Sequence, residues 1–259
     1  MTHTPVANSY RIERQLGAAP GLLVALDFDG TLAPIEDDPD APEITQANRH
    51  AVEALADHPD TLVAVVSGRQ LADLRPRVAV DGVRYVGNHG LEYTVDGERM
   101  VHPEAQARLA DIEAVREEIE RRLADFDGVE VEDKEVTLTV HYRRATDASA
   151  ADVTAVVEDA VDPVEGLQAG SGKMIVEVKP TVDWHKGAVV EWLREEVPET
   201  WRAVYVGDDT TDEDAFRALD EDDLAVLVGE RSTAADYRVS SQAEVSRLLN
   251  RLLGVLDGP

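Results

Sequence analysis

Two aspartates separated by one residue, Asp27 and Asp29, follow an apolar run at 22–26 and lead directly into Gly30. A short apolar run that ends near glycine is typical of a buried strand, so both carboxylates are expected at the carboxyl edge of a sheet, where open α/β sheets hold ligands. Strand side chains alternate, so the two carboxylates are expected on one face. Because adjacent carboxylates repel each other, we favour a catalytic role over the alternative of an acidic loop that caps a helix.

A second acidic cluster supplies a candidate cation site. Residues 203–206 form another apolar run, which leads into the acidic segment 207–213. Magnesium prefers one or two carboxylates together with waters and phosphate oxygens. The predicted metal ligands are Asp27, Asp29 and Asp208. The alternative is a helix start, which suits Asp212 and Glu213 better than Asp208, because acidic side chains in a first turn favour the helix dipole.

Two further strand or loop ends offer groups for an anion. Residues 63–66 end in Ser67 and Gly68, where a hydroxyl and backbone amides at a helix start can bind a phosphate. Lys186 opens another predicted helix, and its ammonium could offset negative charge at the same edge. Each signal is weak alone, because serine is an ordinary N-cap and lysine is common at helix starts. Taken together, they predict phosphate binding by Ser67, Gly68 and Lys186.

The four segments combine into one mechanism. Asp27 would attack a phosphorus atom, and Asp29 would protonate the leaving alcohol and then activate water against the aspartyl-phosphate. A carboxylate is a poor nucleophile toward a dianionic ester unless cations reduce the repulsion. The mechanism therefore requires both Mg²⁺ and Lys186.

The order of the predicted elements indicates an α/β fold. Strands are expected near 22–27, 62–66 and 83–86, with helices near 44–57 and 69–76 between them. This alternation implies a parallel sheet covered by helices on both faces. The alternation returns in the last third of the chain, with a helix at 186–196, a strand at 203–207, a helix at 212–219 and a strand at 224–228.

The middle of the chain differs in character. A hairpin is expected over 92–102 with its turn at Asp96 and Gly97, followed by a charged amphipathic helix at 103–125. Two strands with a turn at 132–134 come next, and then a helix near 147–160 and strands near 165–169 and 174–178. We predict a doubly wound, Rossmann-like parallel-sheet core with an inserted smaller α+β domain. The predicted boundaries are 1–98 and 180–259 for the core and 99–179 for the insert.

The composition limits the partners. The 259 residues include 53 acidic and 25 basic ones, for a formal net charge of −28, which repels nucleic acid and anionic membranes. Such self-repulsion favours a protein adapted to high ionic strength, which we state as a hypothesis. The chain has no cysteine, no amino-terminal targeting pattern and no apolar run of membrane-spanning length. We expect a cytoplasmic, soluble monomer.

These motifs resemble those of the haloacid dehalogenase superfamily of phosphohydrolases. The segment 27–32 resembles its first motif, Ser67 its second, Lys186 its third, and Gly207-Asp208-Asp209 with Asp212 its fourth. The resemblance covers the whole predicted core. It implies a Mg²⁺-dependent phosphatase whose insert is the larger, α/β type of cap.

Within that superfamily the chain resembles the trehalose-6-phosphate phosphatases. The strings at 87–92, 176–180 and 207–213 are similar to that family's own signatures. The resemblance implies hydrolysis of trehalose 6-phosphate to trehalose and phosphate in trehalose biosynthesis. It also implies substrate contacts by Glu92, Lys173, Glu177 and Lys179.

Alternatives remain open at this point. Glu177 and Lys179 could form a cross-strand ion pair on a sheet surface. The substrate could be sucrose phosphate or mannosyl-3-phosphoglycerate, and a non-enzymatic alternative is an acidic cation-binding protein with the same fold. The sequence predicts no element in residues 1–20.

Overall fold

The chain forms two compact units. One joins Met1–Met100 to Trp184–Pro259, and the other is Val101–Asp183; we call them the core unit and the inserted unit. No helix within the described part of the chain is both long enough and apolar enough to cross a membrane. The computed structural model describes residues 4–5, 9–17, 19–36, 41–145, 147–172 and 174–257.

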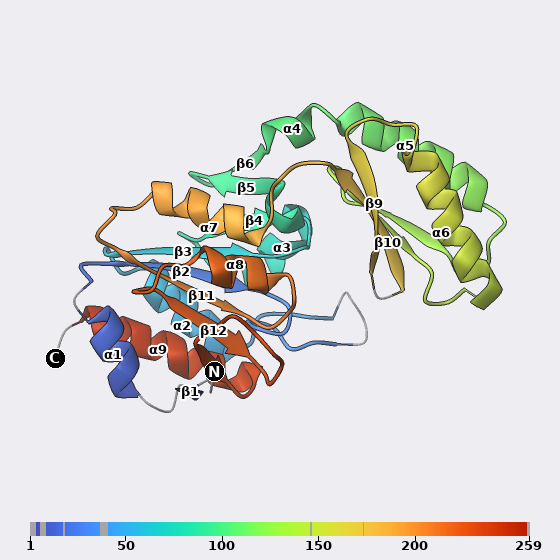
Figure 1. The fold of residues 1–259 in the computed structure, drawn as a ribbon. Helices are drawn as coiled ribbons and strands as arrows, with labels where there is room; N and C mark the ends of the chain where they lie inside the picture. The colour runs from blue at the N-terminus through green and yellow to red at the C-terminus, as the bar shows by residue number, and fades with distance from the viewer. Residues whose placement is uncertain are drawn as a thin grey trace. The chain divides into compact units, whose positions relative to one another are not determined.

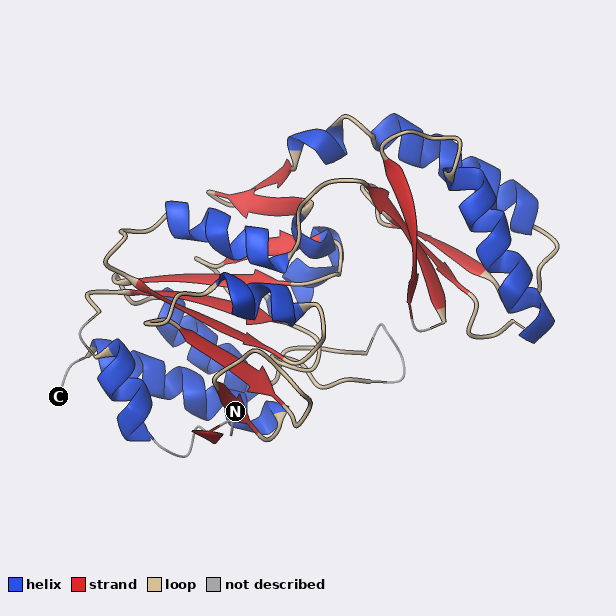
Figure 2. Cartoon of the chain, in the orientation of Figure 1, coloured by secondary structure: helices blue, strands red, loops and turns tan. Residues whose placement is uncertain are grey.

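One mixed sheet runs through the core unit (Figure 2). Its strands within the described residues are β1 (Thr4–Pro5), β2 (Leu22–Asp27), β3 (Thr61–Val66), β4 (Arg84–Gly87), β5 (Glu92–Val95), β6 (Glu98–Val101), β11 (Arg202–Gly207), β12 (Leu224–Val228) and β13 (Tyr237–Val239). They lie in the order β1-β13-β12-β11-β2-β3-β4-β5-β6. Neighbours from β1 to β4 in this order are parallel, and β5 is antiparallel to β4. The predicted α/β class is confirmed.

The central strand β2 carries the first candidate residue to the sheet edge. All six residues of β2 are buried, and the strand pairs with β3 on one side and β11 on the other. The chain order reverses between β2 and β11, and open α/β sheets hold ligands outside the carboxyl ends of the strands at such a point. Because β2 ends at Asp27, this carboxylate lies at that edge.

Helices cover both faces of the core sheet (Figure 1). They are α1 (Ser9–Leu16), α2 (Gln46–Ala56), α3 (Leu71–Val78), α7 (Lys186–Glu195), α8 (Asp212–Ala218) and α9 (Val245–Leu256). Buried side chains of α1, α2, α3 and α9 join one hydrophobic cluster with Val24 and Leu26 of β2. Those of α7 and α8 join a second cluster with Leu23 and Ala25. Alternate residues of one strand thus serve opposite faces, as the strand period requires.

The chain ends hold elements that we did not predict from the sequence. Helix α1 contributes Ile12 and Leu16, which are fully buried, and β13 joins β12 to β1. Helix α9 buries Val245, Leu248, Leu249 and Leu252. Their spacing of three, four and seven positions is typical of an amphipathic helix, so the sequence did carry a signal for α9.

The inserted unit has its own sheet and its own core. Its elements are α4 (Pro103–Gln106), α5 (Leu109–Leu123), β7 (Glu130–Asp133), β8 (Leu138–His141), α6 (Asp147–Val161), β9 (Leu167–Gly172) and β10 (Ile175–Pro180). The sheet is antiparallel, with the order β7-β8-β10-β9. Buried residues of α5 and α6 pack in one cluster with residues of β8 and β10. The α+β character predicted for the middle of the chain is therefore observed.

Two details of the predicted middle stretch are wrong. The helix expected over 103–125 is two helices, because Arg108 between them has φ −107° and ψ 1°, outside the helical region. The turn expected at 132–134 lies at 134–137 instead, since Glu135 has a left-handed φ of 67° and the amide of Lys134 bonds the carbonyl of Thr137. Side-chain periodicity does not report a one-residue backbone break, which explains the first error.

The predicted hairpin at the edge of the core sheet is confirmed. Strands β5 and β6 are neighbours, and Asp96 and Gly97 between them have φ of 50° and 82°. Two consecutive left-handed residues are the requirement of a type I′ turn, which Asp-Gly satisfies at low cost.

Candidate active site

The side chains of Asp27 and Lys186 meet at the carboxyl edge of the core sheet. Asp27 ends β2, Lys186 begins α7, and both are buried, with exposed fractions of 5% and 4%. The Lys186 Nζ donates to Asp27 Oδ1 at 2.6 Å and to Asp212 Oδ1 at 2.7 Å. Burying charged groups is costly even when they are paired, so this arrangement indicates a functional site rather than a packing device.

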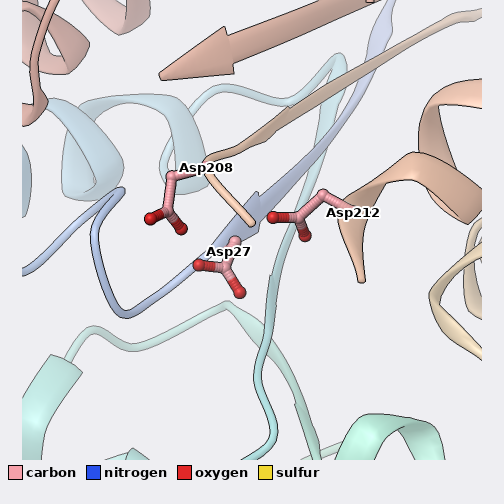
Figure 3. A group of neighbouring side chains, drawn as sticks. All are labelled: Asp27, Asp208 and Asp212. Atoms are coloured by element: carbon pink, nitrogen blue, oxygen red, sulfur yellow. The ribbon is translucent and has the colours of Figure 1, made fainter. Parts of the chain in front are cut away.

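The carboxylates of Asp27, Asp208 and Asp212 lie close together (Figure 3). One oxygen each from Asp27, Asp208 and Asp212 lies within 4.8 Å of the others. Two glycines make room for them: a Cβ on Gly30 would lie 2.2 Å from Asp208 Oδ2, and a Cβ on Gly207 would lie 2.3 Å from Asp212 Cγ. Carboxylate oxygens are the ligands that hard divalent cations prefer. The cluster could therefore bind a metal ion.

Asp212 is part of the site, although the sequence favoured it as an ordinary first-turn residue of a helix. It does begin α8, but its side chain is fully buried and turns toward the cluster. Its Oδ1 accepts from Lys186 Nζ and from the Tyr205 hydroxyl at 2.8 Å, and its Oδ2 accepts from the Asp209 amide at 2.9 Å. These three donors occupy Asp212, so Asp27 and Asp208 are the better candidates to hold a cation.

The carboxylates of this cluster repel one another, and this repulsion changes their pKa values. Burial raises the pKa of Asp27, and the nearby Asp212 and Asp208 carboxylates raise it further against the opposing effect of Lys186. Burial, with Asp212 and Asp209, raises the pKa of Asp208 to about 6. Burial disfavours the Lys186 ammonium, but Asp27 and Asp212 outweigh it and raise its pKa. A bound cation would relieve the repulsion among the carboxylates, as it does at metal sites generally.

Asp29 lies outside this carboxylate cluster. Its Oδ1 and Oδ2 accept from Arg69 Nη2 and Nε, each at 2.8 Å, and its side chain is 40% exposed. An isolated bridge between Asp29 and Ala33 closes the loop that follows β2. The Asp29 side chain is not one of the three clustered carboxylates. Its two predicted roles, in proton transfer and as a metal ligand, remain predictions.

The turn after β3 presents Ser67 and Gly68. Ser67 is buried, and its Oγ accepts from the Arg69 amide at 3.1 Å. It does not cap α3, whose N-cap position is Gln70. A Cβ on Gly68 would lie 2.6 Å from the His89 ring, so any side chain at position 68 would require that ring to move. The alternative of Ser67 as a helix cap is therefore wrong, and its phosphate role remains a prediction.

An arginine that the sequence did not single out holds the acidic loop. Arg231 follows β12, and its Nε donates to the Asp208 carbonyl at 2.8 Å. Its guanidinium also bonds the Asp209 carbonyl and, at 2.7 Å, Glu213 Oε1. Arg231 thus fixes the backbone that carries Asp208. No local sequence pattern marks it, because its partners lie about twenty positions away.

Glu92 is buried and already well bonded. Its Oε1 accepts from the Leu71 amide and from Asn88 Nδ2, both at 2.7 Å, and its Oε2 accepts from Arg99 Nε at 2.8 Å. Its exposed fraction is 2%. These contacts give it a structural role in the core unit, and its predicted substrate contact remains a prediction.

The predicted substrate residues of the inserted unit lie on β10. Lys179 Nζ is 3.9 Å from Glu177 Oε2, and the two side chains are 40% and 20% exposed. They are two positions apart on one strand, so their ion pair runs along the strand. The alternative of a cross-strand ion pair is therefore wrong. Lys173 lies outside the described residues.

Asp27, Asp208 and Lys186 lie together at the switch point of a doubly wound core that carries an insert. The fold is that of the haloacid dehalogenase-like hydrolases. A haloacid dehalogenase-like hydrolase from Bacteroides thetaiotaomicron shares this fold, with a TM-score of 0.65 and 16% identity over 90% of this chain and 99% of its own.

The chain belongs to the trehalose-phosphatase family, whose sequence profile matches residues 25–247. It is 37% identical over 257 residues to a trehalose-phosphate phosphatase of Mycobacterium marinum. A solved structure, that of a trehalose-6-phosphate phosphatase related protein, aligns with a TM-score of 0.78 and 26% identity, over 91% of this chain and 99% of that one. The match to the Mycobacterium marinum relative covers 93% of this chain but 65% of the relative.

Proposed function

We propose that this protein is a Mg²⁺-dependent phosphatase that hydrolyses trehalose 6-phosphate to trehalose and phosphate. The observation that carries the proposal is the buried contact of 2.6 Å between Lys186 Nζ and Asp27 Oδ1, next to Asp208. A nucleophilic carboxylate needs positive charge beside it to approach a phosphate dianion. The family match supplies the substrate class.

In this mechanism Asp27 Oδ2 attacks phosphorus and Lys186 holds Asp27 in place and offsets the charge of the phosphoryl group. Ser67 and the amides of its turn bind the phosphoryl oxygens. Asp29 gives its proton to the leaving sugar oxygen and then takes a proton from the attacking water. Asp27 and Asp208 would hold Mg²⁺, which supplies Lewis-acid stabilisation of the negative charge when bound.

The inserted unit is proposed to act as a cap domain that contributes sugar contacts. The partly exposed side chains of Lys179 and Glu177 offer an ammonium and a carboxylate, groups that bind sugar hydroxyls. The same family resemblance assigns a contact to Lys173. These roles rest on the family match and are tested by substitution.

A panel of sugar phosphates tests the proposal, with phosphate release measured with and without Mg²⁺. We expect kcat/KM for trehalose 6-phosphate to exceed that for sucrose phosphate and mannosyl-3-phosphoglycerate at least about tenfold, or about 1.4 kcal/mol in transition-state binding. Asp27→Asn is expected to remove the activity while the fold is kept. A preference for another ester, or a rate independent of divalent metal, would refute the proposal.

A further inference from the structure

The Arg69 guanidinium binds the Asp29 carboxylate through two of its nitrogens, Nε and Nη2. Nε donates to Oδ2 at 2.8 Å and to Oδ1 at 3.2 Å, and Nη2 donates to Oδ1 at 2.8 Å. The Arg69 side chain is 16% exposed, whereas that of Asp29 is 40% exposed. Arg69 is therefore the more buried partner of this ion pair, and part of the Asp29 side chain is open to solvent.

The guanidinium of Arg69 is itself held in place. Its Nη1 donates to Asp73 Oδ2 at 2.8 Å, and Asp73 Oδ1 accepts from Arg77 Nε at 2.7 Å. Arg77 Nη1 in turn donates to the carbonyl of Pro42 at 3.0 Å. The ring of Phe28, between the two predicted catalytic aspartates, lies 5.7 Å from the guanidinium carbon of Arg69. This chain of contacts fixes the plane of the Arg69 fork.

A partly exposed ion pair of this kind adds little to stability, because water screens it in part. A bidentate guanidinium, however, fixes the orientation of a carboxylate more strictly than an ammonium can. It occupies one edge of the carboxylate, and Oδ2, which accepts one of these hydrogen bonds where Oδ1 accepts two, keeps a second lone pair for another partner. Arg69 thus sets where this free lone pair points without blocking it.

We propose that Arg69 is the positioning residue that orients Asp29 for proton transfer to the leaving group, an inference that rests on the proposed function. In the transfer step a bond forms between Asp27 Oδ2 and phosphorus, and the bond between phosphorus and the sugar oxygen breaks. Asp29 first takes a proton from solvent on the lone pair of Oδ2 that Arg69 leaves free, and that proton moves to the sugar oxygen as the bond to phosphorus breaks. Arg69 exchanges no atom and acts through the direction of the Asp29 carboxyl.

The test compares two esters that differ in their need for a proton. The p-nitrophenolate ion leaves phosphorus without one, whereas a sugar alkoxide does not. For Arg69→Met under single-turnover conditions, we expect the rate of ester cleavage to fall about 100-fold with trehalose 6-phosphate. With p-nitrophenyl phosphate it should stay within about threefold of wild type, and KM for trehalose 6-phosphate should change no more than that.

Arg75→Met is the matched control, since Arg75 is an exposed arginine of the same segment that contacts the Gly97 carbonyl at 3.4 Å instead. It should leave both rates unchanged. A second variant pair places Arg69→Met in an Asp29→Asn background. If Arg69 acts through Asp29, the second substitution should change the rate with trehalose 6-phosphate by less than about twofold.

Three results would overturn the inference: an equal loss of rate with both esters, a change confined to KM, or a full further loss of rate in the Asp29→Asn background.

A second variant is available if circular dichroism shows that Arg69→Met does not fold. Asp73→Asn keeps Arg69 and removes the carboxylate that holds its Nη1. That variant should show the same preference for the aryl ester, with a loss of about three- to tenfold for trehalose 6-phosphate. If wild type cleaves no trehalose 6-phosphate while it cleaves other alkyl phosphates, the proposed function fails, and the same comparison with such an ester still tests Arg69.

Discussion

The Asp208 carboxylate fills the space beside Gly30, so that a Cβ at position 30 would lie 2.2 Å from Asp208 Oδ2. Gly30 also has a φ of 80°, in the left-handed region that favours glycine. The Asp208 carboxylate can therefore take this position only because residue 30 has no side chain.

We predict that Gly30→Ala reduces kcat at least about 100-fold by displacing Asp208 from Asp27. The matched control is Gly97→Ala, because Gly97 has a similar φ of 82° but a Cβ added there would meet no atom within 4 Å. Both variants should lose about 1–2 kcal/mol from the backbone conformation, measured by urea unfolding. Full activity in Gly30→Ala would contradict the packing described for this edge.

The raised pKa of Asp208 makes the stability of the metal-free chain depend on pH. The pKa of Asp208 is about 6 in the folded chain, against an ordinary value of 3.8. At pH values between these two, the folded state keeps a proton on Asp208 that the unfolded state has released. Its stability contribution is fully present below the unfolded value and is lost as pH rises through about 6. Asparagine does not ionise, so the Asp208→Asn variant does not lose this stability as pH rises.

With metal chelated, the free energy of unfolding of Asp208→Asn relative to wild type should therefore increase between about pH 4 and pH 7. Mg²⁺ at neutral pH should stabilise wild type more than the variant, because only wild type has both proposed carboxylate ligands. Urea titrations at several pH values measure both effects. A relative stability that is constant with pH would show that Asp208 is not destabilised by its neighbours.

The sequence predicts a residue's position at the carboxyl edge of the core sheet when that residue stands next to a clear apolar run. Asp27, Asp208 and Lys186 each follow or open an element whose apolar pattern is clear, and the parallel order of β2, β3 and β11 brings such ends to one edge. Arg69 and Arg231 could not be assigned in this way. Their roles come from partners far along the chain, and an arginine in a polar loop has no local feature that names its partner.

The helices and strands likewise include some that local sequence predicts and some that it does not. The central strands were predictable because burial on both faces gives an unbroken apolar run. Strand β13 has three residues and β1 has two, too few for any period to be visible. The break at Arg108 between α4 and α5 follows no change in side-chain pattern, because helix-favouring residues lie on both sides of it.

The paired side chains on β10 lead to a prediction about substrate binding. Lys179→Met and Glu177→Gln should each raise KM for trehalose 6-phosphate about five- to fiftyfold, with a smaller effect on kcat, if they bind sugar or phosphate oxygens. Lys134→Met is the control, since Lys134 is another lysine of the inserted unit, 3.8 Å from Glu132. Unchanged KM values in both β10 variants would remove these residues from the substrate site.

The net charge of −28 leads to a prediction about salt. Between about 0.1 and 2 M KCl the screening length falls from about 10 Å to below 3 Å, so self-repulsion should weaken and Tm should rise. Surface ion pairs such as Arg116 with Glu120 would weaken too, but each contributes less than about 1 kcal/mol. A flat or falling Tm in KCl, with sorbitol as the control for osmolality, would reject adaptation to high ionic strength.

Trapping the phosphorylated enzyme tests whether Asp27 is the nucleophile. Asp29→Asn should slow hydrolysis of the aspartyl-phosphate, so acid quenching after mixing with p-nitrophenyl phosphate should preserve it. Peptide mass spectrometry is then expected to find one phosphoryl group on Asp27, and none when Asp27→Asn is added. Phosphate bound to another residue, or turnover of the ester with no phosphorylated peptide at any time, would contradict Asp27 as the nucleophile.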